Sequence, residues 1–439
     1  MPDDENSKDI LISPRGTLPF LKALLSQAGS SSEGFESAIA SDEDAALQEK
    51  VGAGLQEAVA LFEAETERGG VMFAPDHEAA SLLQSFLAES ASGNIADFQK
   101  GGRLDLNPDG GFEAKFDNHD IAGWAASLFT WWKRLVKKHE FLSPPPMPTP
   151  MPDHARIAVL GDWGSGRYGA PISAATIQAA TPAYDVLLHL GDVYYSGTNK
   201  EVQERFLDLW PKVPGAISRA INSNHEMYSG GEGYFGKTLP QFHQDSSCFA
   251  LENTHFLFVG LDTGYEEHDL TDEQVPWLTE LVEGAEKKQQ KVVLLSHHQP
   301  FSALEKQGTK LVAKLGPLLT NKRIFAWYWG HEHRAVLYDR HPRWGLFGRL
   351  IGHSGFPYFR DKLDETPLIS KNSDGSEWRK LVREGLPDGR ILGGQNRYVK
   401  GEEHKFGPNG HLSLELAGPS IRETVHAPNG DVLFTQVIE

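Results

Sequence analysis

The sequence contains a single cysteine in 439 residues, which excludes an internal disulfide. Cys248 therefore suits a reducing compartment, and we expect it to be a small buried apolar residue. No apolar run approaches the roughly 18 residues that a membrane-spanning helix needs, so we expect no membrane span. The first residues, Met1 to Asn6, are acidic and have neither the basic nor the apolar region of a secretory signal. This favours a cytoplasmic location.

Basic residues are also scarce, because 42 Lys and Arg face 60 Asp and Glu and leave a formal net charge of −18. Such a chain repels phosphate backbones, so we expect no long nucleic acid as substrate or partner. The excess of acidic residues lies in the N-terminal region, where residues 1–120 contain 8 basic and 23 acidic residues. We expect this acidic region to offer a contact surface to a protein partner or to a second copy of the chain.

At its length the chain exceeds the usual size of one domain, and its composition changes along the sequence. Residues 1–35 are polar and rich in Gly and Ser, and we predict a flexible segment. Residues 36–142 are acidic and indicate a mainly helical domain with a hairpin. Proline dominates residues 143–152, which predicts a stiff linker without regular structure. Residues 153–439 then form the main domain.

Apolar residues at helical spacing predict helices over residues 42–68, 76–89 and 120–139. Two alternating runs, 103–106 and 112–116, flank an Asn-Pro-Asp-Gly-Gly turn and predict the hairpin. Aromatic and basic residues interleave in the third helix, which suits either a membrane surface or packing on a core. Packing on a core is the favoured interpretation.

Short apolar runs alternate with helices in the main domain and predict buried strands of an α/β fold. These runs are residues 156–160, 186–190, 216–221, 255–261, 291–295 and 324–329. A helix is predicted over 271–288. The final residues, 410–439, alternate around an Asn-Gly turn and predict antiparallel strands.

Five short segments at the ends of these runs carry polar side chains that could bind metal ions or take part in catalysis. They are Gly161-Asp162-Trp163-Gly164, Gly191-Asp192-Val193-Tyr194-Tyr195, Asn224-His225-Glu226, His297-His298 and Gly330-His331-Glu332-His333. Both aspartates follow a strand and a glycine, which places them at the carboxyl ends of strands, where sites of α/β proteins lie. Together the segments supply carboxylates, an amide, a phenol and imidazoles, which are the ligand types for a pair of metal ions.

In this order the segments resemble the calcineurin-like metallophosphoesterases, and specifically their purple acid phosphatase branch. Gly164 stands where most of the superfamily has a metal-binding histidine. Tyr195 stands three residues after Asp192, where the purple enzymes place a tyrosinate on ferric iron. The resemblance covers about residues 155–360. It implies a four-layer α/β/β/α sandwich of two packed sheets flanked by helices, here with a mainly helical N-terminal extension.

The resemblance also implies two sets of metal ligands. For the first ion they are Asp162, Tyr195 and His333. For the second ion they are Asn224, His297 and His331, with Asp192 bridging both. A phenolate and carboxylates suit a trivalent ion, whereas Asn and His suit a divalent one. The implied pair is therefore Fe(III) with divalent Fe, Zn or Mn.

The implied reaction is attack on phosphorus by a hydroxide that the two metals generate from water. His225 would stabilise the phosphoryl oxygens or protonate the leaving group. Two positions depart from the family. Ser223 replaces a glycine, and Lys306 stands where the purple enzymes have a second catalytic histidine, a role that His298 could cover. His353, in a loop similar to one near the family's metals, is either a substrate contact or a structural histidine.

The sequence therefore predicts an acid-phosphatase-like metallophosphoesterase. Its substrate would be a phosphorylated small molecule or a phosphoprotein, as a monoester or a diester. The alternative hypothesis is a non-catalytic scaffold that retains the metal site and binds a partner through its acidic front.

Overall fold

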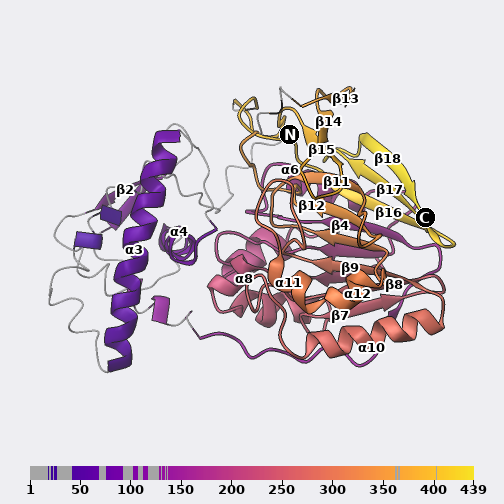
Figure 1. Ribbon diagram of the computed structural model, residues 1–439. Coiled ribbons are helices and arrows are strands. Elements are labelled where there is room, and N and C mark those ends of the chain that lie inside the picture. Colours follow the sequence, from indigo (N-terminus) through magenta and orange to yellow (C-terminus); the bar gives the residue numbers. More distant parts are fainter. Residues whose placement is uncertain are drawn as a thin grey trace.

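The computed structural model describes most of the main domain and separate stretches of the N-terminal region (Figure 1). The described residues are 18, 21–22, 24–26, 42–68, 76–91, 102–106, 112–116, 128–129, 131–133, 135, 137–360, 363, 366–401 and 403–439. Most of the predicted flexible segment, residues 1–35, lies outside this set. Within that segment Leu21 and Leu24 are helical and fully buried, so this part packs on the protein.

Two sheets form the main domain. The smaller sheet has the order β18-β17-β16-β4-β5-β6, in which β4, β5 and β6 are parallel. Its strands are β4 Arg156–Leu160, β5 Val186–His189, β6 Ile217–Ala220, β16 His411–Ala417, β17 Ser420–His426 and β18 Val432–Ile438. The antiparallel strands predicted over residues 410–439 are thus confirmed.

The larger sheet has the order β13-β14-β15-β11-β12-β10-β9-β8-β7-β3, and its strands β8, β9, β10 and β12 are parallel. Its strands are β3 Thr149–Pro150, β7 Phe249–Glu252, β8 Phe256–Gly260, β9 Lys291–Ser296, β10 Ala326–Trp329, β11 Ala335–Arg340, β12 Phe347–Ile351, β13 Leu368–Lys371, β14 Glu377–Leu381 and β15 Gly389–Gly393. All six predicted buried strands are present, with ends shifted by up to two residues.

Short connections and helices join these strands. They are α6 Gly169–Gln178, α7 Asn199–Glu201, α8 Asn224–Tyr228, α9 Leu239–Gln241, α10 Gln274–Lys287, α11 Thr309–Lys314 and α12 Gly316–Thr320, with the short π-helical stretches η2 Val202–Leu207 and η3 Tyr234–Thr238. The helix predicted over 271–288 is α10, which begins three residues later.

Alternating side chains of the central strands, such as β4, β5, β8 and β10, are buried on both faces of their sheets. In β4, Ile157 and Val159 point into the apolar layer between the sheets, whereas Ala158 and Leu160 pack outward with residues of α6. The outer face of the larger sheet packs against α10 in the same way. This alternation follows from the two-residue period of a strand. The predicted α/β fold of two packed sheets flanked by helices is confirmed.

The N-terminal region contains two long helices that lie to one side of the main domain (Figure 1). The helix α3, Asp42–Arg68, has the predicted bounds, and α4, Glu78–Ala91, begins two residues after the predicted start. The strands β1 Gly102–Leu106 and β2 Phe112–Phe116 pair as the predicted hairpin. Much of the helix predicted over 120–139 lies outside the described residues.

The helices of this region share one apolar core with loops of the main domain. Phe62 of α3, Phe86 of α4 and Trp132 are buried in the same cluster as Tyr194 and Tyr228. Tyr194 belongs to a segment that was predicted to bind metals, and Tyr228 follows another such segment closely. The N-terminal region therefore packs over the predicted site. Its acidic residues account for only part of its surface, because other side chains belong to this shared apolar core.

The proline-rich segment differs from the predicted free spacer. Thr149 and Pro150 form β3, a two-residue edge strand that pairs with β7 in the larger sheet. Pro145 is held as well, because its carbonyl accepts a hydrogen bond of 2.8 Å from the Trp277 indole of α10. An edge strand tolerates proline because one side of it needs no ladder hydrogen bonds. The prediction that no regular structure forms here was wrong.

Among the helices of the described residues, none combines the length and the apolar character that crossing a bilayer requires. Cys248 is buried, as predicted.

A buried ion pair links the two sheets. Arg349 of β12 donates to both carboxylate oxygens of Glu423 in β17, at 2.8 and 2.9 Å. Tyr328 of β10 and Gln436 of β18 also donate to this carboxylate, at 2.7 Å each. The pair is at most 1% exposed. Its hydrogen bonds offset the desolvation of both charges and join strands from both sides of the central layer.

We expect Glu423→Gln to lower the free energy of unfolding by about 3 to 5 kcal/mol, because the Arg349 guanidinium would stay buried without its counter-charge. Urea denaturation of the metal-free protein measures this loss. Glu415→Gln is the matched control, because Glu415 pairs with Arg156 and Arg422 at the surface. It should cost less than about 1 kcal/mol. An equally small loss in both variants would contradict this role of the buried pair.

Candidate metal centre

The predicted site residues lie at one edge of the molecule, where the carboxyl ends of parallel strands from both sheets converge. In the smaller sheet Asp162 follows β4, Asp192 follows β5 and Asn224 follows β6. In the larger sheet His297 follows β9 and His331 follows β10. Residues that lie up to 169 positions apart in the chain thus come together.

Four of the predicted ligands adopt a left-handed backbone that side chains other than glycine rarely take. The φ angles are 57° at Asp162, 76° at Asp192, 72° at His331 and 54° at His333. Such conformations cost on the order of 1 to 3 kcal/mol each and persist only where the surroundings impose them. Their concentration at this edge indicates that the chain is bent to aim these side chains inward.

The two aspartates and His297 form one compact group, because their ligand atoms all lie within 4.8 Å of one another. Asp162 and Asp192 are almost completely buried. Burial, reinforced by the neighbouring Asp192, raises the pKa of Asp162 well above its usual range. Burial would also raise the pKa of Asp192, but His297 and His225 hold it well below its usual range. Asp192 is therefore negatively charged, although no Lys or Arg of the described residues pairs with it.

His297 shows that this group suits a metal ion. Its Nδ1 lies 2.7 Å from the Leu190 carbonyl, which can only accept, so Nδ1 carries the proton. The lone pair of Nε2 then faces Asp192 Oδ1 at 3.2 Å and His331 Nδ1 at 3.2 Å. Burial lowers the pKa of His297, which favours the neutral ring that metals bind. The lone pair of His297 Nε2 and the Asp192 carboxylate thus face each other, where a cation would join them.

His333 completes the other side of the carboxylates. Its Nε2 lies 3.5 Å from Asp162 Oδ1 and 3.8 Å from Asp192 Oδ2. Asn224 contributes a buried amide oxygen, and no group of the described residues hydrogen-bonds to this Oδ1. His333 therefore offers a ring nitrogen beside the aspartates. Asn224 offers a buried oxygen of the kind that metal ions bind.

The phenol of the site belongs to Tyr194. Its hydroxyl donates to Asp192 Oδ2 at 2.8 Å and lies 2.5 Å from His333 Nε2. The predicted phenol, Tyr195, instead contacts Glu201 through its backbone N–H and Arg205 through its ring. The geometry therefore favours Tyr194 over Tyr195 as the phenol of the site. Spacing alone cannot tell which of two adjacent tyrosines a tight loop turns inward.

Ser223, which replaces the family's glycine, ties the Asn-His-Glu segment to Asp192. Its hydroxyl lies 2.5 Å from Asp192 Oδ1, contacts the Glu226 carboxyl, and accepts a hydrogen bond from the His225 N–H. Burial raises the pKa of Glu226 to about 8. Glu226 is therefore protonated at neutral pH and can donate to Ser223, which in turn donates to Asp192. The serine in place of glycine thus adds a hydrogen bond to the Asp192 carboxylate.

A hydrogen bond fixes one ring nitrogen of His225. Its Nδ1 lies 2.7 Å from the Tyr195 carbonyl, which can only accept, so Nδ1 is the donor. The ring packs 4.2 Å from the ring of Tyr194 and 4.9 Å from that of Tyr228, measured between centroids. These contacts set the direction in which Nε2 points.

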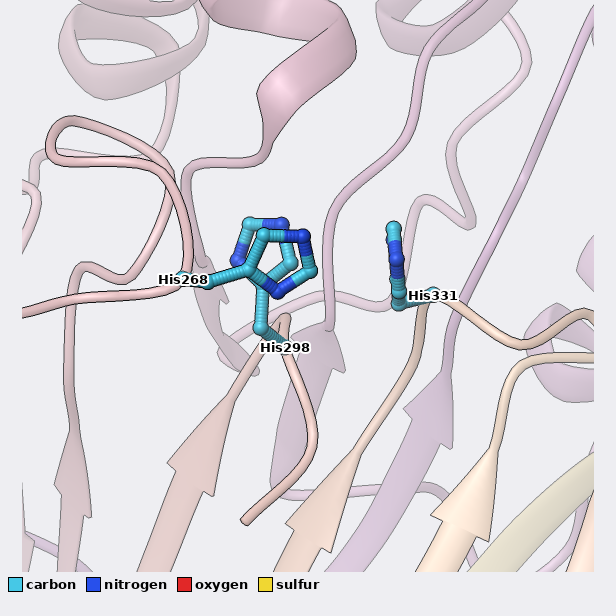
Figure 2. A group of neighbouring side chains, drawn as sticks. All are labelled: His268, His298 and His331. Atoms are coloured by element: carbon cyan, nitrogen blue, oxygen red, sulfur yellow. The ribbon is translucent and has the colours of Figure 1, made fainter. Parts of the chain in front are cut away.

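A second group of histidines lies beside His331 (Figure 2). His268, His298 and His331 each have a ring nitrogen within 4.8 Å of the others. The rings of His268 and His298 are 3.9 Å apart, and those of His298 and His331 are 4.6 Å apart. Burial lowers the pKa of all three, that of His331 to about 3. Neutral imidazoles are therefore available next to the second ligand set.

Sequence reasoning missed His268, because it lies in the loop after β8 and carries no motif. The signal that could have found it is its place after a buried strand of the same sheet as His297 and His331. His298, a predicted catalytic residue, is fully buried and its Nδ1 lies 3.0 Å from Thr263 Oγ1. Its Nε2 has no hydrogen-bond partner among the described residues.

Two other predicted residues lie farther from the aspartates. Lys306 is exposed, and its positive charge contributes to the lowered pKa of His268, after burial and His297. It therefore stands at the rim behind that histidine. His353 is fully buried next to Gly410, and burial lowers its pKa to about 3. No contact with the grouped ligands supports His353 as a substrate contact, which favours the structural alternative.

Part of the main domain matches a known protein family. Residues 155–335 match the family model described as calcineurin-like phosphoesterase. The match covers less than half of the chain and spans the predicted ligands from Asp162 to His333. It supports the superfamily prediction, and the purple acid phosphatase branch remains a prediction.

The solved structures that are similar to this chain include two phosphatases. One is a purple acid phosphatase from yellow lupin seeds, with 13% identity and a TM-score of 0.48 over 68% of this chain and 55% of the lupin chain. This chain thus matches little more than half of the lupin protein. The other is a dimetal phosphatase from Danio rerio, with 12% identity and a TM-score of 0.38 over 65% of this chain and 98% of that chain. Among curated proteins, none matches the chain.

The two tyrosines can be separated by substitution. We expect Tyr194→Phe to weaken metal binding by about 10- to 100-fold, because it removes the hydroxyl that contacts Asp192 and His333. Tyr195→Phe, the matched control one residue away, should change the affinity less than about threefold. Competition with a chromophoric chelator measures both dissociation constants. A larger loss in Tyr195→Phe would restore the original prediction.

Proposed function

We propose that the phosphoesterase domain hydrolyses phosphate esters with the help of two metal ions held by the grouped side chains. Asp162, Tyr194 and His333 would hold the first ion. Asn224, His297 and His331 would hold the second, and Asp192 would bind both. The observation that carries the proposal is the convergence of Asp162, Asp192 and His297, whose ligand atoms lie within 4.8 Å of one another. No Lys or Arg of the described residues pairs with the Asp192 carboxylate.

The ions would be Fe(III) and divalent Fe, Zn or Mn, as in the purple acid phosphatase branch. A phenol beside the carboxylates supports a trivalent ion on that side. When bound, such a pair generates hydroxide near neutral pH and withdraws negative charge from the phosphate. The buried Asp162 and Asp192 would hold the ions away from bulk water. His297 and His331, whose pKa values are lowered by burial, would bind as neutral ligands and leave the positive charge of the ions for an anionic substrate.

His225 would contact the phosphate through Nε2. Since its Nδ1–H is engaged by the Tyr195 carbonyl, a proton on Nε2 can pass only to substrate or water. His225 can therefore donate a hydrogen bond to a phosphoryl oxygen, or a proton to the departing alcohol.

His298 and the newly identified His268 would take the place of the family's second catalytic histidine. His298 Nε2 has no partner among the described residues, which suits a hydrogen bond to a bound phosphate. Exposed Lys306 would add a positive charge at the rim and attract an anionic substrate without acting as an acid. A phosphorylated small molecule or a phosphoprotein remains the proposed substrate class.

The proposal predicts metal-dependent release of p-nitrophenol from p-nitrophenyl phosphate or from bis(p-nitrophenyl) phosphate. We expect Asp192→Ala and His331→Ala to lower kcat/KM at least about 1,000-fold, because each removes a ligand and its share of the charge stabilisation. His255→Ala, at the opposite end of β8, is the control and should keep the activity of the parent protein.

Full activity in either ligand variant would contradict the proposal. A metal-loaded protein that hydrolyses neither ester, and binds phosphorylated ligands without turnover, would instead favour the scaffold hypothesis.

A further inference from the structure

One side chain of the N-terminal region reaches the proposed metal ligands. Asp76 lies just before α4, and its Oδ1 accepts hydrogen bonds from Asn224 Nδ2 at 2.5 Å and from the Tyr228 hydroxyl at 2.8 Å. Its Oδ2 lies 3.9 Å from His331 Nε2. Asp76 precedes Asn224 by 148 residues, so this contact joins separate parts of the fold.

The contact determines which way the Asn224 amide faces. The oxygen and nitrogen of an amide have nearly the same shape, so packing alone does not distinguish the two orientations. A carboxylate can only accept hydrogen bonds, and the atom that faces Asp76 must therefore be Nδ2. Tyr228 supports this orientation, because its hydroxyl donates to Asp76 and accepts from Nδ2 at 2.9 Å. Oδ1 is left facing the other way, buried and without a partner among the described residues.

We propose that Asp76 is a positioning residue of the metal centre, which holds the Asn224 amide with its oxygen toward the second ion. The inference rests on the proposed role of Asn224 as a ligand. It assigns the acidic N-terminal region a function inside the molecule, because a carboxylate that binds no substrate sets the geometry of a ligand.

The position of Asp76 is itself fixed by buried contacts of α4. Ser85, about two turns along from the helix start, donates to Glu201 Oε1 at 2.8 Å and lies 2.6 Å from Ser196 Oγ. Glu201 accepts the backbone N–H of Tyr195 at 2.7 Å. All these groups are buried. The helix that follows Asp76 is therefore anchored to the loop that carries Asp192.

Asp76 differs from the other carboxylates around it. A cavity of about 530 Å³ beside Asn224 is lined by Asp76, Glu78 and Glu267 among other residues. Glu78 instead pairs with Lys50 at 3.4 Å, and no hydrogen bond joins Glu78 or Glu267 to Asn224 among the described residues. Substitution of Glu78 is therefore a matched control, because it removes a negative charge from the same cavity without touching Asn224.

The test measures the dissociation constant of each bound ion by competition between the full-length protein and a chromophoric chelator, with Zn²⁺ as the probe. We expect Asp76→Asn to raise the dissociation constant of one ion by about 10- to 100-fold and to leave that of the other unchanged. The reason is that the amide introduced by this substitution can donate as well as accept, so it no longer dictates how the Asn224 amide is oriented. Tyr228→Phe should add to this loss. Glu78→Gln should change neither constant by more than about threefold.

A rescue separates positioning from a general loss of structure. A carboxylate at position 224 has two equivalent oxygens and needs no orientation, so in the Asn224→Asp background the further change Asp76→Asn should cause no loss of affinity. Continued weakening in that background would overturn the inference. So would unchanged zinc affinity in Asp76→Asn, or faster hydrolysis at unchanged affinity, which would make Asp76 a plug of the site. If the parent protein binds fewer than two ions, the proposed function fails first.

Discussion

Two carboxylates buried at the meeting point of two sheets are the constraint on which the rest of this structure depends. Asp162 and Asp192 are enclosed by imidazoles, a phenol and backbone amides, and no Lys or Arg of the described residues pairs with them. Burying such charge costs several kcal/mol unless a counter-charge is supplied. The same molecule supplies one where only stability is at stake, at the Arg349–Glu423 pair between the sheets. The difference between the two sites supports the proposal that bound cations supply the counter-charge at the aspartates.

The surroundings of the aspartates follow from that requirement. The carboxyl ends of parallel strands deliver the ligands, and left-handed turns aim Asp162, Asp192 and His331 inward. Burial lowers the pKa of His297, His298 and His331, which favours neutral rings. Carbonyl oxygens accept hydrogen bonds from Nδ1 of His225 and of His297. The side chains around Asp162 and Asp192 thus direct electron pairs or protons toward the same part of the site. That arrangement suits binding and polarising a phosphate between fixed groups.

Much of this could be predicted from the sequence, because strand ends and motif order are local properties. Apolar runs located the six strands, and the segments after them named Asp162, Asp192, Asn224, His297, His331 and His333 before their proximity was known. What failed depended on three-dimensional detail. The choice between Tyr194 and Tyr195 needs the path of a tight loop, and His268 needs the packing of a loop that has no motif. Asp76 belongs to a region of different composition, and the β-pairing of Thr149 and Pro150 needs the position of β7.

The central claim is that these residues hold two ions at once, and metal content tests it most directly. The purified full-length protein, dialysed against a metal buffer and measured by elemental analysis, should contain two ions per chain. His297→Ala should retain about one, because Asp162, Asp192, Tyr194 and His333 would still bind the first ion. One ion or none in the parent protein, or two ions that persist in the variant, would contradict the account.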